Sequence, residues 1–400
     1  MSAVGKWLAD PNRKPLFKLF GYAGTGKTTL AKHFAEGVSG TVLFAAFTGK
    51  AASVMRSNGC HNADTIHRLI YKPTPKSDVR LLELNGHLAE LRSKFDAIPE
   101  GAPESELVLD QIEEAEIEKK TITEDLKKPS FVLNFDSQVK EAALLIIDEC
   151  SMVNEDMGRD LLSFDTPILV LGDPAQLPPV GGSGYFTRGE PDEMLTEIHR
   201  QAQDSPIIQI ATNIRLGKSV ERGTYGDTLV THVRDLPPES VMGHDQMIVG
   251  RNLTRKSFNS RAREVLGRKS HLPETGDKLV CLRNDHKVGL LNGEIWMTDE
   301  GTVIDDDEIV LQLRHEESGE ALICDAHRHH FEGRELEYFE RLRAQEFDYG
   351  YALTCHKSQG SQWPSVIVFD ESGCFRKDRK RWLYTAVTRA ADRVTLVQGF

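Results

Sequence analysis

A glycine-rich loop that contains one lysine lies near the start of the sequence. Residues 21–28 read Gly-Tyr-Ala-Gly-Thr-Gly-Lys-Thr, between an apolar run at 16–20 and a helix-like segment at 29–34. Such glycines let backbone N–H groups surround phosphate oxygens, while the lysine reaches the outer phosphates and the threonine hydroxyl can hold Mg²⁺. We therefore predict a nucleoside triphosphate site whose contacts are Gly21, Gly24, Thr25, Gly26, Lys27, Thr28 and Thr29.

Two adjacent acids follow a second apolar run. Residues 143–147 are Ala-Leu-Leu-Ile-Ile and lead directly into Asp148 and Glu149. Hydrolysis of a triphosphate needs a carboxylate that holds Mg²⁺ and a base that orients the attacking water. We assign Asp148 to the metal, with Thr28, and Glu149 to the base. A third apolar run ends at Gly172, and the following loop carries Gln176, whose amide can sense the γ-phosphate.

Alternating strands and helices must position these loops. Apolar runs at 16–20, 41–47, 142–147 and 167–171 have the length of buried parallel strands, and helical patterns lie between them. A second set begins after residue 205, with a helix at 207–216, a strand at 246–250 and a helix at 255–266. The sequence therefore predicts two α/β domains.

Each predicted domain is interrupted by an insertion. We place the first domain at residues 1–70 and 136–195, around an insertion at 71–135. Leucines at helical spacing predict two antiparallel helices in this insertion, above a base of strands at 71–76 and 130–135. We place the second domain at 196–275 and 346–400. Short alternating stretches between turns at 276–345 predict a small β-barrel.

Composition narrows the classes of protein that fit. The 400 residues are 39% apolar, no stretch is long enough to span a membrane, and the N-terminus is too polar for a signal peptide. We expect a cytoplasmic protein; the family resemblance given below further implies a bacterial cell or a phage-infected host. The six cysteines lie far apart, which favours reduced thiols.

The charge of the chain is unevenly distributed. The net charge is −12, but basic stretches at 251–269 and 376–393 are suited to a phosphate backbone. Solvated helix faces are the alternative interpretation of either stretch.

Several motifs together resemble a known helicase family. Residues 148–152, Asp-Glu-Cys-Ser-Met, and 172–179, Gly-Asp-Pro-Ala-Gln-Leu-Pro-Pro, look like motifs II and III of superfamily 1B DNA helicases of the RecD/Dda-like type. The resemblance implies two RecA-like domains, with an SH3-like barrel in the second, and ATP and Mg²⁺ as cofactors. It also implies a monomer that translocates 5′ to 3′ on single-stranded DNA and unwinds duplex.

Other segments match the remaining motifs of that family. Residues 47–52, 65–69 and 351–360 resemble motifs Ia, Ib and V, which implies DNA contacts by Thr48, Lys50, Thr65, His67, Thr354, His356 and Lys357. Residues 195–201 and 384–390 resemble motifs IV and VI. This resemblance makes Arg200 a γ-phosphate contact and Arg389 an arginine finger, and it adds Gly360 to the nucleotide contacts.

Two departures from the family pattern leave alternatives open. The glutamine that reads adenine in the family has no counterpart, because the first glutamine here is Gln111. Either the chain is truncated at its N-terminus or other groups hold the base. The insertion at 71–135 is long and acidic, so only its strand base is expected to touch a DNA fork. Its helices either recruit a protein partner or are a solvated hairpin.

Three other interpretations stay open at this point. The chain fits an RNA helicase of the same superfamily, because the sequence does not reveal a preference against the 2′-hydroxyl. It also fits a nucleotide-gated DNA-binding scaffold. Cys324, His327, His329 and His330 suggest zinc, but no paired Cys-x-x-Cys completes such a site, so we assign no metal there.

Overall fold

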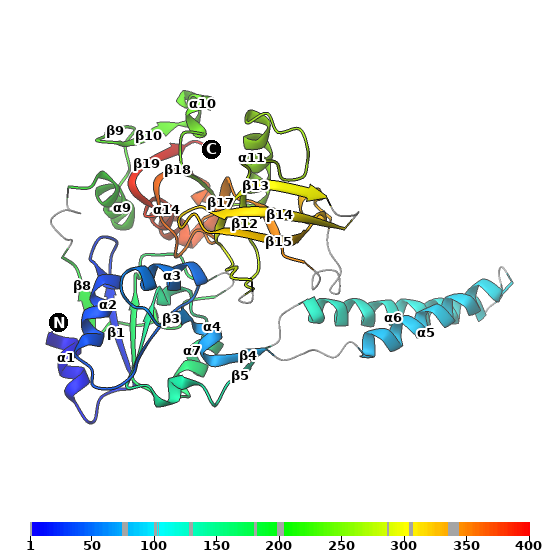
Figure 1. Ribbon diagram of the computed structural model, residues 1–400, viewed down its shortest axis with the longest axis horizontal. Helices are drawn as coiled ribbons and strands as arrows, with labels where there is room; N and C mark the ends of the chain where they lie inside the picture. The colour runs from blue at the N-terminus through cyan, green and yellow to red at the C-terminus, as the bar shows by residue number, and fades with distance from the viewer. Residues whose placement is uncertain are drawn as a thin grey trace.

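Two parallel sheets organise the protein. The computed structural model describes residues 2–73, 79–99, 102, 104–127, 131–179, 182–197, 204–285, 288–303, 307–334 and 344–400. Figure 1 shows the first sheet with its helices below the second, and a long pair of helices that extends away from both. Among the described residues, no helix has the length and apolar content needed to cross a bilayer.

The first sheet brings the predicted nucleotide loops to one edge. Its order is β3-β2-β6-β7-β1-β8, and every neighbouring pair is parallel. Because β6, β7 and β1 are adjacent, the loops that follow their carboxyl ends lie side by side. The strands are β1 (Leu16–Gly21), β2 (Val42–Ala46), β3 (Ala63–Thr65), β6 (Leu144–Asp148), β7 (Ile168–Gly172) and β8 (Glu193–Leu195).

Helices complete this first domain. Two of them begin directly at predicted functional loops, α2 at Lys27 and α3 at Gly49. Helix α1 was not predicted from the sequence; Val4 and Trp7 bury it against the core. The helices are α1 (Ser2–Ala9), α2 (Lys27–Glu36), α3 (Gly49–Ser57), α4 (Ile66–Ile70), α7 (Glu155–Leu162), and the short 3-10 helices η1 (Gln138–Glu141) and η2 (Cys150–Met152).

The second sheet repeats this arrangement. Its order is β17-β11-β18-β19-β10-β9, and only the edge pair β9–β10 is antiparallel. The strands are β9 (Gly223–Tyr225), β10 (Thr228–His232), β11 (Gln246–Val249), β17 (Ala352–Thr354), β18 (Trp363–Phe369) and β19 (Ala390–Gln398). The helices are α9 (Pro206–Leu216), α10 (Pro238–Val241), α11 (Asn252–Val265), α14 (Arg379–Val387), η3 (Val233–Asp235) and η4 (Ser372–Asp378).

A helical hairpin rises from a two-stranded base in the first domain. Strands β4 (Tyr71–Pro73) and β5 (Phe131–Leu133) pair antiparallel. Between them, α5 (Val79–Ala97) and α6 (Glu104–Lys127) run side by side away from the body, as Figure 1 shows. Leu81, Leu84, Leu88 and Leu91 of α5 are buried, which explains their helical spacing in the sequence. Residues 74–76 and 130 of the predicted strand base lie outside the described residues.

A five-stranded antiparallel sheet interrupts the second domain. Its order is β15-β14-β13-β12-β16. Strand β16 pairs with β12 and lies beyond residue 345, where we expected this unit to end. A three-residue strand carries too little pattern to be predicted. The elements are β12 (Lys278–Cys281), β13 (Ile295–Val303), β14 (Glu308–His315), β15 (Ala321–His327), α12 (His329–Glu332) and β16 (Phe347–Tyr349).

All six cysteines are unpaired thiols, in agreement with the expectation of reduced cysteines. Five are buried, and Cys374 is exposed. Within the described ranges, no group of three or more histidines, cysteines and acids is placed to hold a metal ion. His329 contacts Asp307 and Glu332 through its two ring nitrogens, which accounts for part of the histidine-rich segment.

Candidate functional site: a nucleotide cleft and a strand-binding face

The glycine-rich loop has the shape expected of a phosphate cradle. Gly24 and Gly26 have φ of +80° and +74°, a region that glycine enters without strain. The Thr25 hydroxyl donates to Tyr22 O at 2.8 Å within the loop. A Cβ at Gly21 would collide with this hydroxyl, so position 21 has no room for a side chain. Lys27 and Thr28 lie in the first turn of α2, as does the exposed Thr29.

The lysine of this loop is folded over it. Lys27 Nζ donates to Gly21 O at 2.7 Å and to Tyr22 O at 3.1 Å. These neutral carbonyl partners leave its positive charge available to an anion that enters the loop. The geometry therefore suits a phosphate at this position.

A hydroxyl and a carboxylate meet at the predicted metal position. Thr28 Oγ1 donates to Asp148 Oδ2 at 2.6 Å, across the gap between α2 and β6. Burial and the neighbouring charge of Glu149 raise the pKa of Asp148 to about 6. A divalent cation would offset both effects, so this pair of oxygen ligands fits Mg²⁺.

Glu149 has an unusual backbone. Its φ of +51° lies in the left-handed region, which costs a non-glycine residue about 1–3 kcal/mol. Its N–H donates to Asp148 Oδ1 at 2.8 Å, and the side chain stays half-buried beside the loop. Strain of this kind persists where the surrounding structure holds a side chain in one position, as a base that orients water requires.

The loop after β7 joins the two domains. Tyr384 of α14 donates its hydroxyl proton to Asp173 Oδ2 at 2.6 Å and accepts the N–H of Ala23 at 2.8 Å. Leu177 N donates to Thr385 Oγ1 at 2.9 Å. One hydrogen-bonded bridge thus connects the phosphate loop, the loop after β7 and the second domain.

Gln176 lies within this bridge. Its side chain is buried, and its Oε1 has no hydrogen-bond partner among the described residues. A buried acceptor without a partner is costly, so this position favours a donor supplied by a ligand or by water.

The predicted arginines are placed differently from each other. Arg389 is buried and donates to Thr385 O and Ser361 O, both at 3.1 Å, so its guanidinium is held inside the second domain. Arg200 lies outside the described residues. Arg215 of α9 lies over the Tyr22 ring, 3.7 Å from its centroid, and is a second-domain cation that sequence reasoning missed.

Two of the predicted DNA-contact threonines are helix caps. Thr48 Oγ1 accepts the N–H of Ala51 at the start of α3, and Thr65 Oγ1 accepts the N–H of Arg68 at the start of α4. Thr354 Oγ1 accepts the N–H of Lys357 in the same way. These hydroxyls set the direction of the chain at each loop.

One contact joins the predicted motif V segment to the first domain. A Cβ at Gly360 would lie 2.8 Å from Thr48 Oγ1 and 3.1 Å from Ala51 Cβ, so this glycine packs closely against the first domain. Burial lowers the pKa of the His67 and His356 imidazoles, which are therefore neutral near pH 7. Neutral rings can stack on bases but add no positive charge.

The first-domain lysine that was predicted to contact DNA already has a partner. Lys50 is buried, and its ammonium pairs with Glu317 in the turn between β14 and β15. Lys278 pairs with Glu316 of the same turn. An acidic turn of the small sheet therefore covers the first-domain lysine that the sequence assigned to DNA.

Family models agree with this geometry. A model described as an AAA domain matches residues 3–233, more than half of the chain. The chain belongs to the AAA-domain family. A second model, the UvrD-like helicase C-terminal domain, matches residues 349–397 of this AAA-domain protein.

A bacterial helicase is similar to this chain in sequence. The AAA-domain protein is 27% identical over 284 residues to the ATP-dependent RecD2 DNA helicase of Deinococcus radiodurans. The match covers 62% of this chain and 35% of that protein, so the chain spans about a third of its relative's length.

Two solved structures share the fold. The first is that of Pif1 helicases at forked duplex DNA, at a TM-score of 0.52, and the second is Bacteroides Pif1 bound to single-stranded DNA, at 0.51. Each is 17% identical, and the match covers 99% of this chain and 91% of that one. The predicted membership of superfamily 1B is confirmed.

Sequence reasoning missed the bridging residues of the AAA-domain protein. Asp173, Tyr384 and Gln359 lie inside segments that matched motifs III, VI and V, but no role was assigned to them. Gln359 Nε2 donates to Leu177 O at 2.9 Å. The motif matches located these residues, while their partners depend on how the two domains pack.

Proposed function

We propose that this protein is an ATP-dependent DNA helicase that translocates 5′ to 3′ on single-stranded DNA and unwinds duplex. The observation that carries the proposal is the bridge from Ala23 through Tyr384 to Asp173. It ties the phosphate loop to the second domain, which also carries the motif V residues His356 and Lys357. The names of the relatives support the substrate, since RecD2 is a DNA helicase and Bacteroides Pif1 was solved with single-stranded DNA.

We propose ATP and Mg²⁺ as the cofactors. Thr28 and Asp148 would hold the metal ion, which supplies charge neutralisation at the β- and γ-phosphates. Lys27 contacts the outer phosphates, Glu149 orients the attacking water, and the Gln176 amide contacts the γ-phosphate or that water. We propose that Arg200 and Arg389 complete the site, which requires the Arg389 guanidinium to leave its carbonyl partners.

The two domains then convert hydrolysis into movement. Interactions between Tyr384, Asp173 and Ala23 favour a closed cleft, and loss of the γ-phosphate changes the charge next to this bridge. Opening and closing would alternate the grip of the first-domain face and of motif V on the strand. In this proposal, residues 1–70 and 136–195 form one RecA-like domain and 196–275 with 350–400 the other. The sheet from β12 to β16 is an SH3-like barrel.

An unwinding assay tests the proposal. Labelled duplexes with a 5′ or a 3′ single-stranded tail are mixed with the protein, ATP and Mg²⁺. We expect unwinding of the 5′-tailed substrate only and none by Lys27→Ala. Unwinding of only the 3′-tailed duplex would reverse the polarity, and activity in Lys27→Ala would refute the nucleotide mechanism. Slow ATP turnover that DNA does not stimulate would favour the nucleotide-gated scaffold.

The pair between Lys50 and Glu317 leads to a first prediction. We expect Glu317→Gln to bind single-stranded DNA several-fold more tightly, because the change frees a cation on the proposed strand face. Fluorescence anisotropy with a labelled oligothymidylate measures this affinity. Glu320→Gln, at an exposed position on the same turn, is the control and is expected to bind like the unaltered protein. Equal affinities in all three proteins would show that Lys50 contributes nothing to the strand.

The base of the helical hairpin leads to a second prediction. Phe131 is 44% exposed and contacts the rings of His67 and Tyr71. We expect Phe131→Ala to slow unwinding about tenfold while DNA-stimulated ATP hydrolysis stays unchanged, because a base stacked on this ring separates from its partner.

Replacing residues 81–126 by a short loop should leave unwinding intact. A larger loss from that deletion than from Phe131→Ala would make the hairpin itself the wedge.

A further inference from the structure

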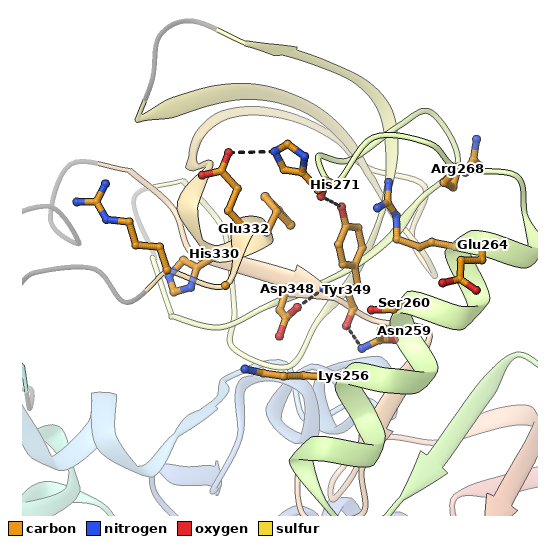
Figure 2. A pocket seen from close by; sticks show the side chains of 14 residues that line it. Lys256, Asn259, Ser260, Glu264, Arg268, His271, His330, Glu332, Asp348 and Tyr349 are labelled. Carbon is orange, nitrogen blue, oxygen red and sulfur yellow. Dashed lines mark hydrogen bonds and ion pairs between the residues drawn. The ribbon is translucent and has the colours of Figure 1, made fainter.

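A cavity lies in the second half of the chain, where the small sheet meets the second domain. It has a volume of about 720 Å³ and lies between α11, α12 and β16. Figure 2 shows Lys256, Ser260 and Glu264 projecting from α11 on one side, with His330 and Glu332 on the other. None of the residues that line it belongs to the nucleotide site, so any ligand here is separate from ATP.

The acids on the α11 side of this cavity are already compensated. Arg261 Nη1 donates to Glu264 Oε2 at 2.7 Å, and Arg255 Nη1 donates to Asp348 Oδ2 at 2.7 Å. Both arginines lie outside the lining. These pairs neutralise two of the negative charges that line the cavity.

The acid on the α12 side is compensated as well. Arg328 Nε donates to Glu332 Oε1 at 2.7 Å, and His271 lies 3.0 Å from the same oxygen, as the dashed line in Figure 2 shows. Burial opposes the charged form of Glu332, but hydrogen bonds from His329, Arg328 and His271 lower its pKa to about 2. Glu332 is therefore ionised and paired, and it leaves no net negative charge for a ligand.

Two cations of the lining are less fully paired than the acids. No described residue pairs with Lys256, whose side chain extends from α11 below Asp348 in Figure 2. Arg268 approaches Asp277 only at 3.7 Å, and its buried Nε has no hydrogen-bond partner among the described residues. Asp277 is shared with Arg263 and the Tyr351 hydroxyl, and Glu274 lies 3.7 Å from Arg263 as a second acid next to the two arginines. Lys256 therefore gives the lining an excess of positive charge, which suits an anion.

The position of the cavity indicates which anion. Asp348 of β16 lies three residues before the motif V segment at 351–360, and Arg255 of α11 donates to it at 2.7 Å. Asp348 also lines the cavity, next to Lys256. The cavity thus begins where the proposed strand path through motif V ends, and its volume is in the range that holds one nucleotide.

We propose that this cavity binds the sugar-phosphate backbone of the single strand where it extends past motif V, with Lys256 and Arg268 as phosphate contacts. The inference rests on the proposed function, because it extends the same strand. It adds a site that holds the strand independently of ATP.

Binding of oligothymidylates of two lengths tests the inference. Fluorescence anisotropy is measured over a range of salt concentrations with oligomers of about 8 and about 20 nucleotides. The protein is compared with Lys256→Ala/Arg268→Ala, with the charge-preserving Lys256→Arg/Arg268→Lys, and with Arg234→Ala, an exposed arginine of η3 outside the lining, as the control. Thermal unfolding of each variant verifies that it is folded.

We expect the Ala double variant to bind the longer oligomer about tenfold more weakly, with a salt slope lower by about 1.4, since each single-strand phosphate contact contributes about 0.7. Its affinity for the short oligomer, the charge-preserving variant and the control should be unchanged. Equal losses at both lengths, or no loss at the longer one, would overturn the inference. Failure of the unaltered protein to bind either oligomer would instead refute the proposed function.

Discussion

Glu149→Gln is expected to slow ATP hydrolysis by about 100- to 10,000-fold and to leave nucleotide binding nearly unchanged. Glutamine keeps the volume of the side chain but cannot accept a proton from the attacking water. Glu149 has a left-handed backbone and directly follows Asp148, the carboxylate that we assign to the metal ion. Single-turnover hydrolysis and binding of a fluorescent ATP analogue measure the two quantities separately.

The control for this experiment is Glu155→Gln. The Glu155 side chain is 40% exposed on α7 and pairs with Arg159 and Arg188. We expect normal hydrolysis from this variant. Hydrolysis by Glu149→Gln within tenfold of the unaltered rate would exclude Glu149 as the base, and loss of nucleotide binding would show that its role is to shape the loop.

Asp277→Asn is expected to lower the free energy of unfolding by about 3 kcal/mol or more. Asp277 is fully buried, and the Arg263 side chain that pairs with it is 8% exposed. The guanidinium also donates to Ser270 O and Leu272 O, so it cannot turn to solvent when its counter-charge is lost. Denaturation by urea, followed by intrinsic fluorescence, measures the change.

An exposed ion pair provides the comparison. Asp299 pairs with Arg314 at 2.8 Å, and their side chains are 39% and 59% exposed. Water screens such a pair, so Asp299→Asn should cost no more than about 1 kcal/mol. Equal destabilisation by the two variants would mean that burial of the Arg263–Asp277 pair contributes nothing.

The nucleotide half-site was largely predictable from the sequence. The loop from Gly21 to Thr28, the acids Asp148 and Glu149, and Gln176 each follow an apolar run of strand length. Strand length and turn chemistry are local properties, and the parallel order of β6, β7 and β1 brings their carboxyl ends to one edge. The contact between Thr28 and Asp148 follows from that arrangement.

The residues proposed to bind single-stranded DNA were predicted less completely. Motif matches located Thr48, Thr65 and Thr354, but their hydroxyls cap the loops in which they lie. The pairing of Lys50 with Glu317 depends on where the turn of a separate sheet comes to rest. The sequence around residue 50 contains no pattern that predicts the position of that turn.

The sequence by itself determined the local chemistry of this protein: a phosphate loop, a metal carboxylate with its adjacent base, and the alternation of strands and helices that carries them. Only the tertiary structure decided which groups of the two domains meet. The Tyr384 hydroxyl donates to Asp173, which lies 211 residues earlier in the chain. The Arg389 guanidinium donates to a carbonyl of its own domain. Such contacts depend on how whole domains pack, and packing energy is summed over many residues that no short segment contains.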